Sequence, residues 1–529
     1  MPAIITDQYR ILNAETFVDS FSGIGTNRVN NYYSFLGHPN PKNTDVKNYG
    51  DSGWGNPVPN PIDAFDQENF YYDSMLFLKK VTSNDVRRVV PRLDWQTGTT
   101  YEMYRNNYSS TNRTPQTKST TLYGSQYFVV NSEFNVYLCI NNGSTPDHPD
   151  GQGSQFEPTH TNTVPQEAGN GSDGYLWKYL FTISPSDIVK FVTTSYIPLP
   201  KQWGDTSTKT VKDASVDGKI ETVVIKNGGS GYSIDESGTV VSTGTISDIP
   251  ITGDGTGGTI SLNISSGIIE SVSGVVGGSG YTYASVRFEA GNFGGKTLIP
   301  GTDAEFEVVI PPKGGHGADI YRELGGFRVM LYSKYDNNVD HVPDYVVGND
   351  FSRVGLVKNP LQFGGTDLLN NTTATNLGAL KLKPDTASGL STSQVTYAPN
   401  DLITQTVGVG STAVGYVASW NPDTGVLRYY QPVGFSTLST YSYKKLDFVG
   451  MNTAITGGSP ENLVVDVNFN NRESIAVGGK NVDLGQTFNL GKANPDVKKY
   501  SGEIIYIDNR APVTRTSSQK EEVKIVIEF

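Results

Sequence analysis

The chain has 529 residues, of which 36% are hydrophobic and 18% charged, and its formal net charge is −12. This acidic balance argues against a general nucleic-acid binder, whose affinity comes largely from Lys and Arg on phosphates. The N-terminus lacks a basic segment followed by an apolar one, and no apolar run approaches about 18 residues, so we expect neither a signal peptide nor a membrane-spanning helix.

The composition predicts an all-β protein with few short helices. Glycine (58), tyrosine (30) and phenylalanine (22) are plentiful, and aromatic and β-branched side chains fill a pleated surface well. The single cysteine, Cys139, excludes an internal disulfide, and its apolar surroundings, Val136–Ile140, predict a buried thiol. A long chain without disulfides fits folding in a reducing cytoplasm.

The first two segments are rich in aromatic residues. Residues 1–90 are predicted to be the first part of a core β domain, and residues 91–207 its second β domain. We expect a short helix that begins at Asn13, a good N-cap, with Phe17 and Phe21 on one face. A second helix is expected after Pro61 with Phe65 inward, and a long surface loop over 37–61.

Strands are predicted further along the second segment. The run Tyr127–Ile140 indicates two strands joined near Asn131–Glu133, and the run Tyr175–Ile183 indicates another strand that stops at Ser184-Pro185.

An internal repeat marks residues 208–310, which we interpret as an inserted Gly/Ser/Thr-rich β module. Gly218–Ser233 and Gly267–Thr282 are identical at 9 of 16 positions with an offset of 49. Each copy is a short strand followed by Gly-Gly-Ser-Gly-Tyr. The glycines allow a tight turn with positive φ, and the tyrosine is expected to pack back on the strand.

The remaining segments are predicted to alternate between parts of the core and an inserted module. Residues 311–365 continue the core, residues 366–490 form a second inserted β module, and residues 491–529 supply C-terminal strands that complete the core. The second module contains a predicted hairpin, Ala413–Trp420 with Val426–Tyr430. The last residues alternate apolar and charged side chains, which predicts a half-buried strand that must pair with earlier ones.

Two glycine-rich motifs fall short of catalytic patterns. Gly294-Gly295-Lys296-Thr297 lacks the earlier glycine that a phosphate-binding loop requires, and Gly228-Gly229-Ser230-Gly231 lacks the spacing of a nucleophile elbow. Both are predicted to be turns.

The titratable residues form no recognisable constellation. None of the five histidines has zinc-site spacing; these are His38, His148, His160, His316 and His341. His316 lies in a Pro/Gly turn, where it would contact a partner or cap the turn. Acid pairs such as Asp63 with Asp66 and Glu521 with Glu522 are expected in a chain with 53 acids, and Trp95 and Trp177 are predicted to pack in a core or an interface. We therefore predict no catalytic, cofactor-binding or metal-binding residues.

Five stretches, in this order along the chain, resemble the baseplate wedge family known as gene product eight of T-even-type contractile-tailed phages. They are Val90–Trp95, Asp173–Phe181, Tyr196–Pro200, Phe351–Pro360 and Ser501–Pro512, the last followed by Glu521-Glu522 and the terminal strand. The opening stretch Tyr9–Phe21 is also compatible with the pattern of this family, but more weakly. The two glycine-rich segments depart from that pattern, and the Gly-Gly-Ser-Gly-Tyr repeats resemble modules in structural proteins of T-even-like phages of cyanobacteria.

The resemblance implies a discontinuous pair of β-sandwich domains that here carries two inserted modules. It also implies a homodimer that joins other wedge subunits around a central hub and relays the trigger for sheath contraction. The protein would be a virion component that is assembled in the host cytoplasm. It would have no enzymatic activity and no cofactor, and it would bind no nucleic acid, membrane or small-molecule substrate. Aromatic-rich segments at 31–36, 70–77 and 101–108 could anchor partners, although 70–78 also fits a core strand.

Two other functions remain open. A receptor- or glycan-binding tail protein would use the glycine-rich insertions for recognition, and the purified protein would then bind host cells. A polysaccharide-cleaving enzyme would need two carboxylates facing each other across a groove.

Overall fold

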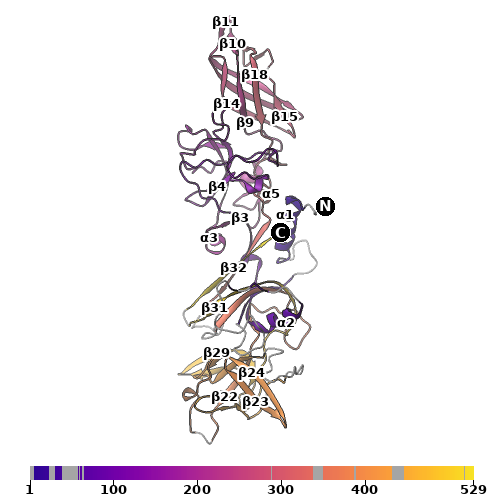
Figure 1. Ribbon diagram of the computed structural model, residues 1–529, viewed down its shortest axis with the longest axis vertical. Coiled ribbons are helices and arrows are strands. Elements are labelled where there is room, and N and C mark those ends of the chain that lie inside the picture. Colours follow the sequence, from indigo (N-terminus) through magenta and orange to yellow (C-terminus); the bar gives the residue numbers. More distant parts are fainter. Residues whose placement is uncertain are drawn as a thin grey trace. The chain divides into compact units, whose positions relative to one another are not determined.

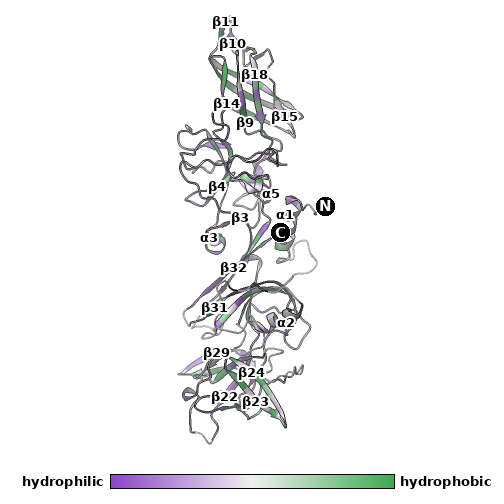
Figure 2. Ribbon diagram, in the orientation of Figure 1, coloured by the Kyte–Doolittle hydropathy of each residue, from purple (hydrophilic) through white to green (hydrophobic). Residues whose placement is uncertain are grey.

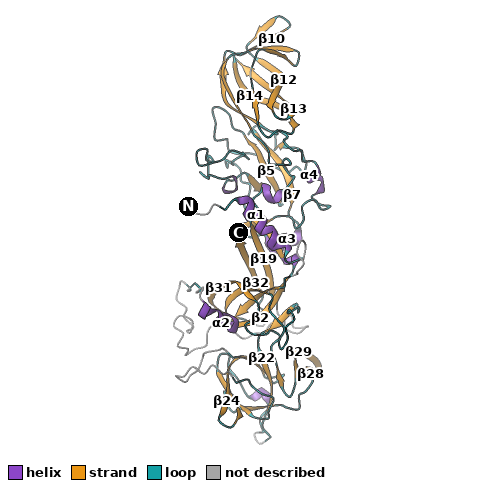
Figure 3. Cartoon of the chain, turned by 90° about the vertical axis from the view of Figure 1, so that its right-hand side faces the viewer, coloured by secondary structure: helices purple, strands orange, loops and turns teal. Residues whose placement is uncertain are grey.

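The computed structural model describes residues 5–22, 30–38, 58, 60–61, 65–287, 289–336, 350–386, 389–431, 446–516 and 519–529. Strands dominate the regular structure (Figure 3), which confirms the predicted all-β class with few short helices. The chain divides into two compact units. Unit 1 comprises Met1–Thr16, Arg87–Met330 and Val526–Phe529, and unit 2 comprises Phe17–Val86 and Leu331–Ile525. The division into six segments stays a prediction.

The largest core of unit 1 surrounds a four-stranded sheet in the order β4-β5-β7-β6. Its strands are β4 (Phe128–Val130), β5 (Asn135–Asn142), β6 (Gln166–Glu167) and β7 (Tyr175–Thr182) (Figure 1). The strands predicted within 127–140 and at 175–183 are thereby confirmed. Nearly every side chain of β5 is buried, which explains its continuous apolar run. Cys139 and Trp177 lie in this core as predicted, and burial raises the pKa of the Cys139 thiol.

Short elements connect this sheet to the rest of unit 1. Strand β3 (Val86–Pro91) pairs with β8 (Tyr196–Pro198). Helix α3 (Pro185–Phe191) begins at Ser184, whose hydroxyl accepts a hydrogen bond from Asp187 N–H, and this cap ends the preceding strand where the sequence predicted. The remaining short elements are η2 (Leu122–Gly124), α4 (Lys209–Asp213) and α5 (Ile320–Glu323).

The first helix begins earlier than predicted. Helix α1 spans Asp7–Asp19, so Asn13 lies in its interior and the predicted N-cap is wrong. Tyr9 N–H donates to the hydroxyl of Thr6, which is an equally suitable capping residue that the prediction passed over. Phe17 and Phe21 do lie on one side, with their rings in edge contact at 5.2 Å. The second predicted helix exists as α2 (Phe65–Ser74), but the Phe65 side chain and most of the 37–61 loop lie outside the described residues.

The glycine-rich part of unit 1, residues 208–310, is built almost entirely of strands packed on their own apolar core. One sheet has the order β14-β13-β12-β15, a second has the order β11-β10-β17-β16, and β18 pairs with β9. The strands are β9 (Val223–Ser230), β10 (Ser233–Glu236), β11 (Thr239–Val241), β12 (Gly244–Gly253), β13 (Thr256–Ser265), β14 (Ile268–Ser279), β15 (Ala284–Val286), β16 (Gly291–Phe293), β17 (Lys296–Ile299) and β18 (Thr302–Val308).

The two copies of the repeat contact each other reciprocally. Tyr232 N–H donates to Gly267 O at 3.0 Å, and the equivalent Tyr281 N–H donates to Gly218 O at 3.3 Å. In each Gly-Gly-Ser-Gly-Tyr turn the second and third glycines have positive φ, and both tyrosines are buried, as predicted. In the same way, Gly228 of the first copy approaches Ile269 O of the second.

Gly277 is the equivalent of Gly228 in the second copy, and we expect its replacement to separate the two copies. A Cβ at Gly277 would lie closer to Ile220 O than real Cβ atoms come to a backbone atom. Gly277→Ala should therefore destabilise this part of unit 1 by about 1–3 kcal/mol through overpacking. Amide hydrogen exchange of β9 and β14 measures the loss. Gly274→Ala is the matched control, because the same strand offers its Cβ no atom closer than 3.8 Å; equal effects of the two variants would contradict the prediction.

Unit 2 contains a five-stranded sheet that brings together distant parts of the chain. Its order is β21-β2-β1-β20-β31, with β1 (Tyr32–Gly37), β2 (Met75–Val81), β20 (Asp350–Lys358), β21 (Thr373–Thr375) and β31 (Glu503–Thr514). β20 is an interior strand, because it pairs with both β1 and β31, and Leu356 lies opposite Tyr506. The chain also forms η1 (Ser83–Asp85) after β2 and β19 (Arg328–Tyr335) before β20.

Most of the aromatic side chains predicted to anchor partners are buried within the chain and do not lie on its surface, whereas Tyr108 is half-buried. Residues 32–37 form a fully buried strand, and the side chains from Tyr71 to Leu78 are buried in α2 and β2. Tyr101 and Tyr104 lie in the core of unit 1. Glycine and asparagine residues near these aromatic residues made the segments resemble loops. Large aromatic side chains bury much apolar area, so they pack in the core once strands pair around them. The core alternative for 70–78 is confirmed.

A closed barrel forms the rest of unit 2. Its strands follow the order β25-β24-β23-β26-β27-β22, and β22 also pairs with β25, which closes the ring; β30 pairs with β22 at the side. They are β22 (Gly378–Lys383), β23 (Leu402–Gly408), β24 (Ser411–Asn421), β25 (Val426–Tyr430), β26 (Ala454–Ile455), β27 (Leu463–Val465) and β30 (Lys492–Ala493). The predicted hairpin is β24–β25 and is confirmed. Figure 2 shows apolar residues along β23 and β24, which enclose the barrel core.

Four further elements complete the described part of the chain. Turn η3 (Thr392–Gln394) lies between β22 and β23, and β28 (Arg472–Val477) pairs with β29 (Lys480–Phe488). The terminal strand β32 (Glu521–Glu528) is half-buried as predicted, with Ile525 buried.

Candidate functional site

The glycine-rich motifs are turns, as the sequence predicts. Gly294 and Gly295 have positive φ and join β16 to β17, and Lys296 contacts Glu236 at 3.5 Å. Ser230 ends β9 at the turn toward β10, with no helix after it.

The histidines lie apart, and His316 has the most defined surroundings. Its Nδ1 lies 2.6 Å from Glu323 Oε1, both side chains are buried, and the other Glu323 oxygen accepts Gly317 N–H at 2.7 Å. This pair holds the Pro/Gly turn against α5, which fits the capping alternative. His38 stacks on Tyr430, burial lowers the pKa of His160, and His148 lies in an exposed loop. His341 lies outside the described residues.

The other candidates also stay separate. Glu521 pairs with Arg515 at 2.9 Å, whereas Glu522 accepts the hydroxyl of Tyr332. Trp95 packs against the core that contains Trp177. The side chains of Asp63 and Asp66 lie outside the described residues. Over the part of the chain that is described, no three His, Cys, Asp or Glu residues cluster to hold a metal, and no helix is long and apolar enough to cross a membrane.

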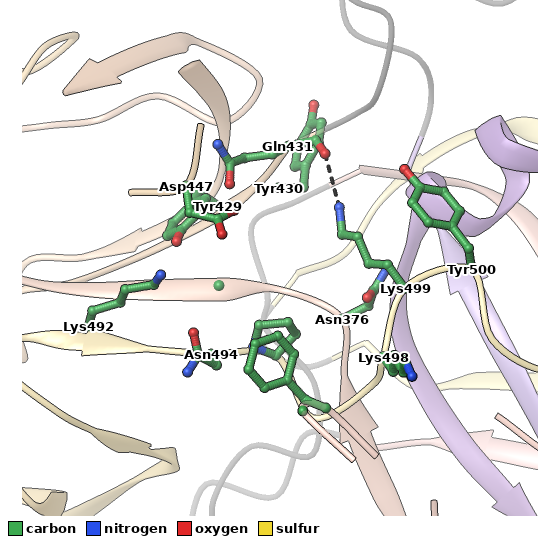
Figure 4. A pocket seen from close by; sticks show the side chains of 14 residues that line it. Asn376, Tyr429, Tyr430, Gln431, Asp447, Lys492, Asn494, Lys498, Lys499 and Tyr500 are labelled. Carbon is green, nitrogen blue, oxygen red and sulfur yellow. Dashed lines mark hydrogen bonds between the residues drawn. The ribbon is translucent and has the colours of Figure 1, made fainter. Parts of the chain in front are cut away.

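Unit 2 contains a pocket that sequence reasoning missed. It has a volume of about 500 Å³ and lies between the barrel and the segment that follows β30 (Figure 4). Tyr429 and Tyr430 come from β25, Lys492 comes from β30, and the segment 494–500 supplies most of one wall. Gly378 in β22 is required here, because a Cβ would clash with the Tyr429 ring. The lining residues are Phe363, Gly364, Asn376, Gly378, Tyr429, Tyr430, Gln431, Asp447, Lys492, Asn494, Pro495, Lys498, Lys499 and Tyr500.

The pocket is positively charged within an acidic chain. Three lysines and one aspartate line it. Lys499 Nζ donates to Gln431 O at 2.9 Å and lies 3.4 Å from Asp73, which also accepts the Tyr500 hydroxyl. Burial lowers the pKa of Lys492, although the nearby Asp447 opposes this effect. The signal in the sequence was the local run Lys492–Tyr500, which holds three lysines and one aspartate.

The comparison with known families identifies one segment of unit 1. Residues 115–217 match the Phage-Gp8 family, described as Bacteriophage T4, Gp8. The similarity to that family covers this one segment of the chain. The matched segment contains the strands β4 to β8 and two of the five stretches quoted above, Asp173–Phe181 and Tyr196–Pro200. No curated protein matches the chain.

The match supports a general role. It favours a structural role in a phage tail baseplate for this β-rich chain. It covers about a fifth of the sequence, and that part includes the sheet β4-β5-β7-β6 in the largest core of unit 1.

Proposed function

We propose that this chain is a member of the Phage-Gp8 family that assembles as a homodimer with other wedge subunits around the central hub of the baseplate and relays the trigger for sheath contraction. It acts without catalysis, cofactor or nucleic acid, and assembles in the host cytoplasm. The observation that carries the proposal is the family match over residues 115–217. Transmission of a mechanical signal requires rigid bodies, because a soft element would absorb the displacement.

The contacts between residues 208–310 and the rest of unit 1 support this rigidity. The Glu307 carboxylate lies 2.9 Å from Arg105 NH1 and 2.9 Å from Lys226 Nζ, and it accepts a hydrogen bond from Asn107 at 2.8 Å. Arg105 and Asn107 bind this partly buried carboxylate from outside residues 208–310 and hold the glycine-rich part against the 105–107 segment, whereas Lys226 adds a cation from within that part.

Lowering the pH is expected to weaken the attachment of the glycine-rich part through Glu307. Burial alone would raise the pKa of Glu307, but Arg105, Lys226 and Asn107 outweigh it and lower the pKa below the ordinary 4.5. Because the folded pKa is the lower one, the stabilisation is complete above about pH 4.5 and is lost as the pH falls through the folded value. Glu307→Gln should therefore reduce, between pH 6 and pH 3, the pH dependence of the urea concentration at which unit 1 unfolds. Glu305→Gln, an exposed neighbour on the same strand, should leave it unchanged; identical profiles for both variants would contradict the assignment.

The assembly itself is tested by co-expression of the full chain with the other wedge proteins of the same phage, followed by size-exclusion chromatography with light scattering. We expect a complex with wedge partners, and for the protein alone twice the mass of the 57.3 kDa chain. A monomer that binds no wedge protein would overturn the proposal. Specific binding of the purified chain to host cells would instead favour the receptor-binding alternative.

A further inference from the structure

We propose that the pocket of unit 2 binds a small hydroxylated organic anion, of the sugar acid or sugar phosphate class, through Lys492 and Lys498. This inference concerns a ligand that is bound and not transformed. It does not depend on the assembly role proposed above.

The cations of the pocket are incompletely neutralised by the protein. Lys499 is the lysine with a carboxylate partner, Asp73. Lys498 donates to Gly365 O at 3.3 Å, which leaves its charge unpaired. For the Lys492 ammonium, the described residues provide no hydrogen bond and no ion pair; Asp447 favours its charged form but stays beyond ion-pair distance. A partly buried, unpaired ammonium is costly, and an anion entering the pocket would relieve that cost.

The other polar groups of the pocket could accept hydrogen bonds from ligand hydroxyl groups. Asp447 and Asn494 are exposed at the pocket, and neither side chain has a hydrogen-bond partner among the described residues. An ionised carboxylate only accepts hydrogen bonds, so Asp447 would repel a bare anion but would accept ligand hydroxyls. Asn494 can donate and accept. The combination of cations and an acceptor therefore selects a ligand that carries both a negative charge and hydroxyl groups.

The size and apolar walls agree with this class. Ligand sites usually enclose about 300–1,000 Å³ and combine apolar walls with a few polar groups, and this pocket encloses about 500 Å³. Phe363 and Tyr429 contribute aromatic surface to the lining, which suits the C–H face of a sugar ring.

Isothermal titration calorimetry of the full chain with glucuronate and with glucose 6-phosphate tests the proposal, with uncharged glucose for comparison. We expect binding of at least one anion with a dissociation constant of about 10 μM to 1 mM, and the anion that binds tells carboxylate from phosphate. Lys492→Met and Lys498→Met should each weaken binding by about tenfold or more. Lys498 is exposed, so its variant remains informative if Lys492→Met fails to fold.

Lys480→Met is the matched control, because Lys480 is an exposed lysine of β29 that does not line the pocket. It should bind as the unmodified chain does. Binding of neither anion, binding of glucose as tight as that of the anions, or equal affinities of the Lys498→Met and Lys480→Met variants would each overturn the proposal.

Discussion

Replacing Glu221 by leucine is expected to lower the free energy of unfolding of unit 1 by about 3–5 kcal/mol. Glu221 Oε1 lies 2.9 Å from Lys178 Nζ, and the two side chains are only 7% and 3% exposed. The substitution leaves an ammonium group in the core of unit 1 with the carbonyl of Thr163, at 3.1 Å, as its remaining partner. A carbonyl supplies a dipole but no charge, so most of the desolvation cost of Lys178 would be uncompensated.

The double variant separates this cost from loss of packing. Lys178→Met combined with Glu221→Leu removes both charges and keeps the volume, so it should be neutral or even stabilising relative to the unmodified chain. Lys209 and Asp213 form an exposed pair in α4 at 2.6 Å, and Asp213→Ala should cost less than about 1 kcal/mol. Amide hydrogen exchange of β7 is the appropriate measurement, because a chain with two units does not unfold in one step. A double variant as unstable as Glu221→Leu would show that shape, not charge, dominates here.

The surroundings of Lys178 show which features could be predicted from the sequence and which could not. The run Tyr175–Ile183 gave the correct strand, because its aromatic and apolar residues have an unambiguous β pattern. The burial of Lys178 depends on Glu221, which lies 43 residues later in the chain and outside this predicted strand. Local patterns predict elements well, whereas pairs between distant segments require the three-dimensional arrangement.

The glycine repeat was predictable for a different reason. Its two copies are related by one offset, and the contacts between them repeat with that same offset, from Tyr232–Gly267 to Tyr281–Gly218. The barrel gave no comparable signal. Its closure is the pairing of Gly378–Lys381 with Val426–Tyr429, which hydrophobic periodicity cannot specify. The pocket depends on that closure, so its three lysines could be seen in the sequence only as a local excess of charge.

Replacing Glu102 by alanine is expected to release the 114–126 segment and to cost about 2–4 kcal/mol. Glu102 is fully buried. One carboxylate oxygen accepts hydrogen bonds from the backbone N–H groups of Gln116 and Thr117, at 3.0 and 2.7 Å, and the other accepts Gln126 N–H at 2.6 Å. Alanine would leave these three N–H groups and the Thr117 hydroxyl, which also donates to Glu102, without this acceptor, although water can reach the exposed Gln116 and Thr117 more easily than Gln126.

Limited trypsin digestion reads out this release directly, because Arg113 and Lys118 are exposed cleavage sites beside the bonded amides. Cleavage should be faster in Glu102→Ala, while exchange at β9 and β14 stays unchanged if the effect is local. Glu133→Ala, which removes an exposed carboxylate from the same unit, should be cut at the unmodified rate. Most of this segment lies within the matched residues 115–217, so slow cleavage in Glu102→Ala would mean that packing of the surrounding core, not this carboxylate, holds the segment in place.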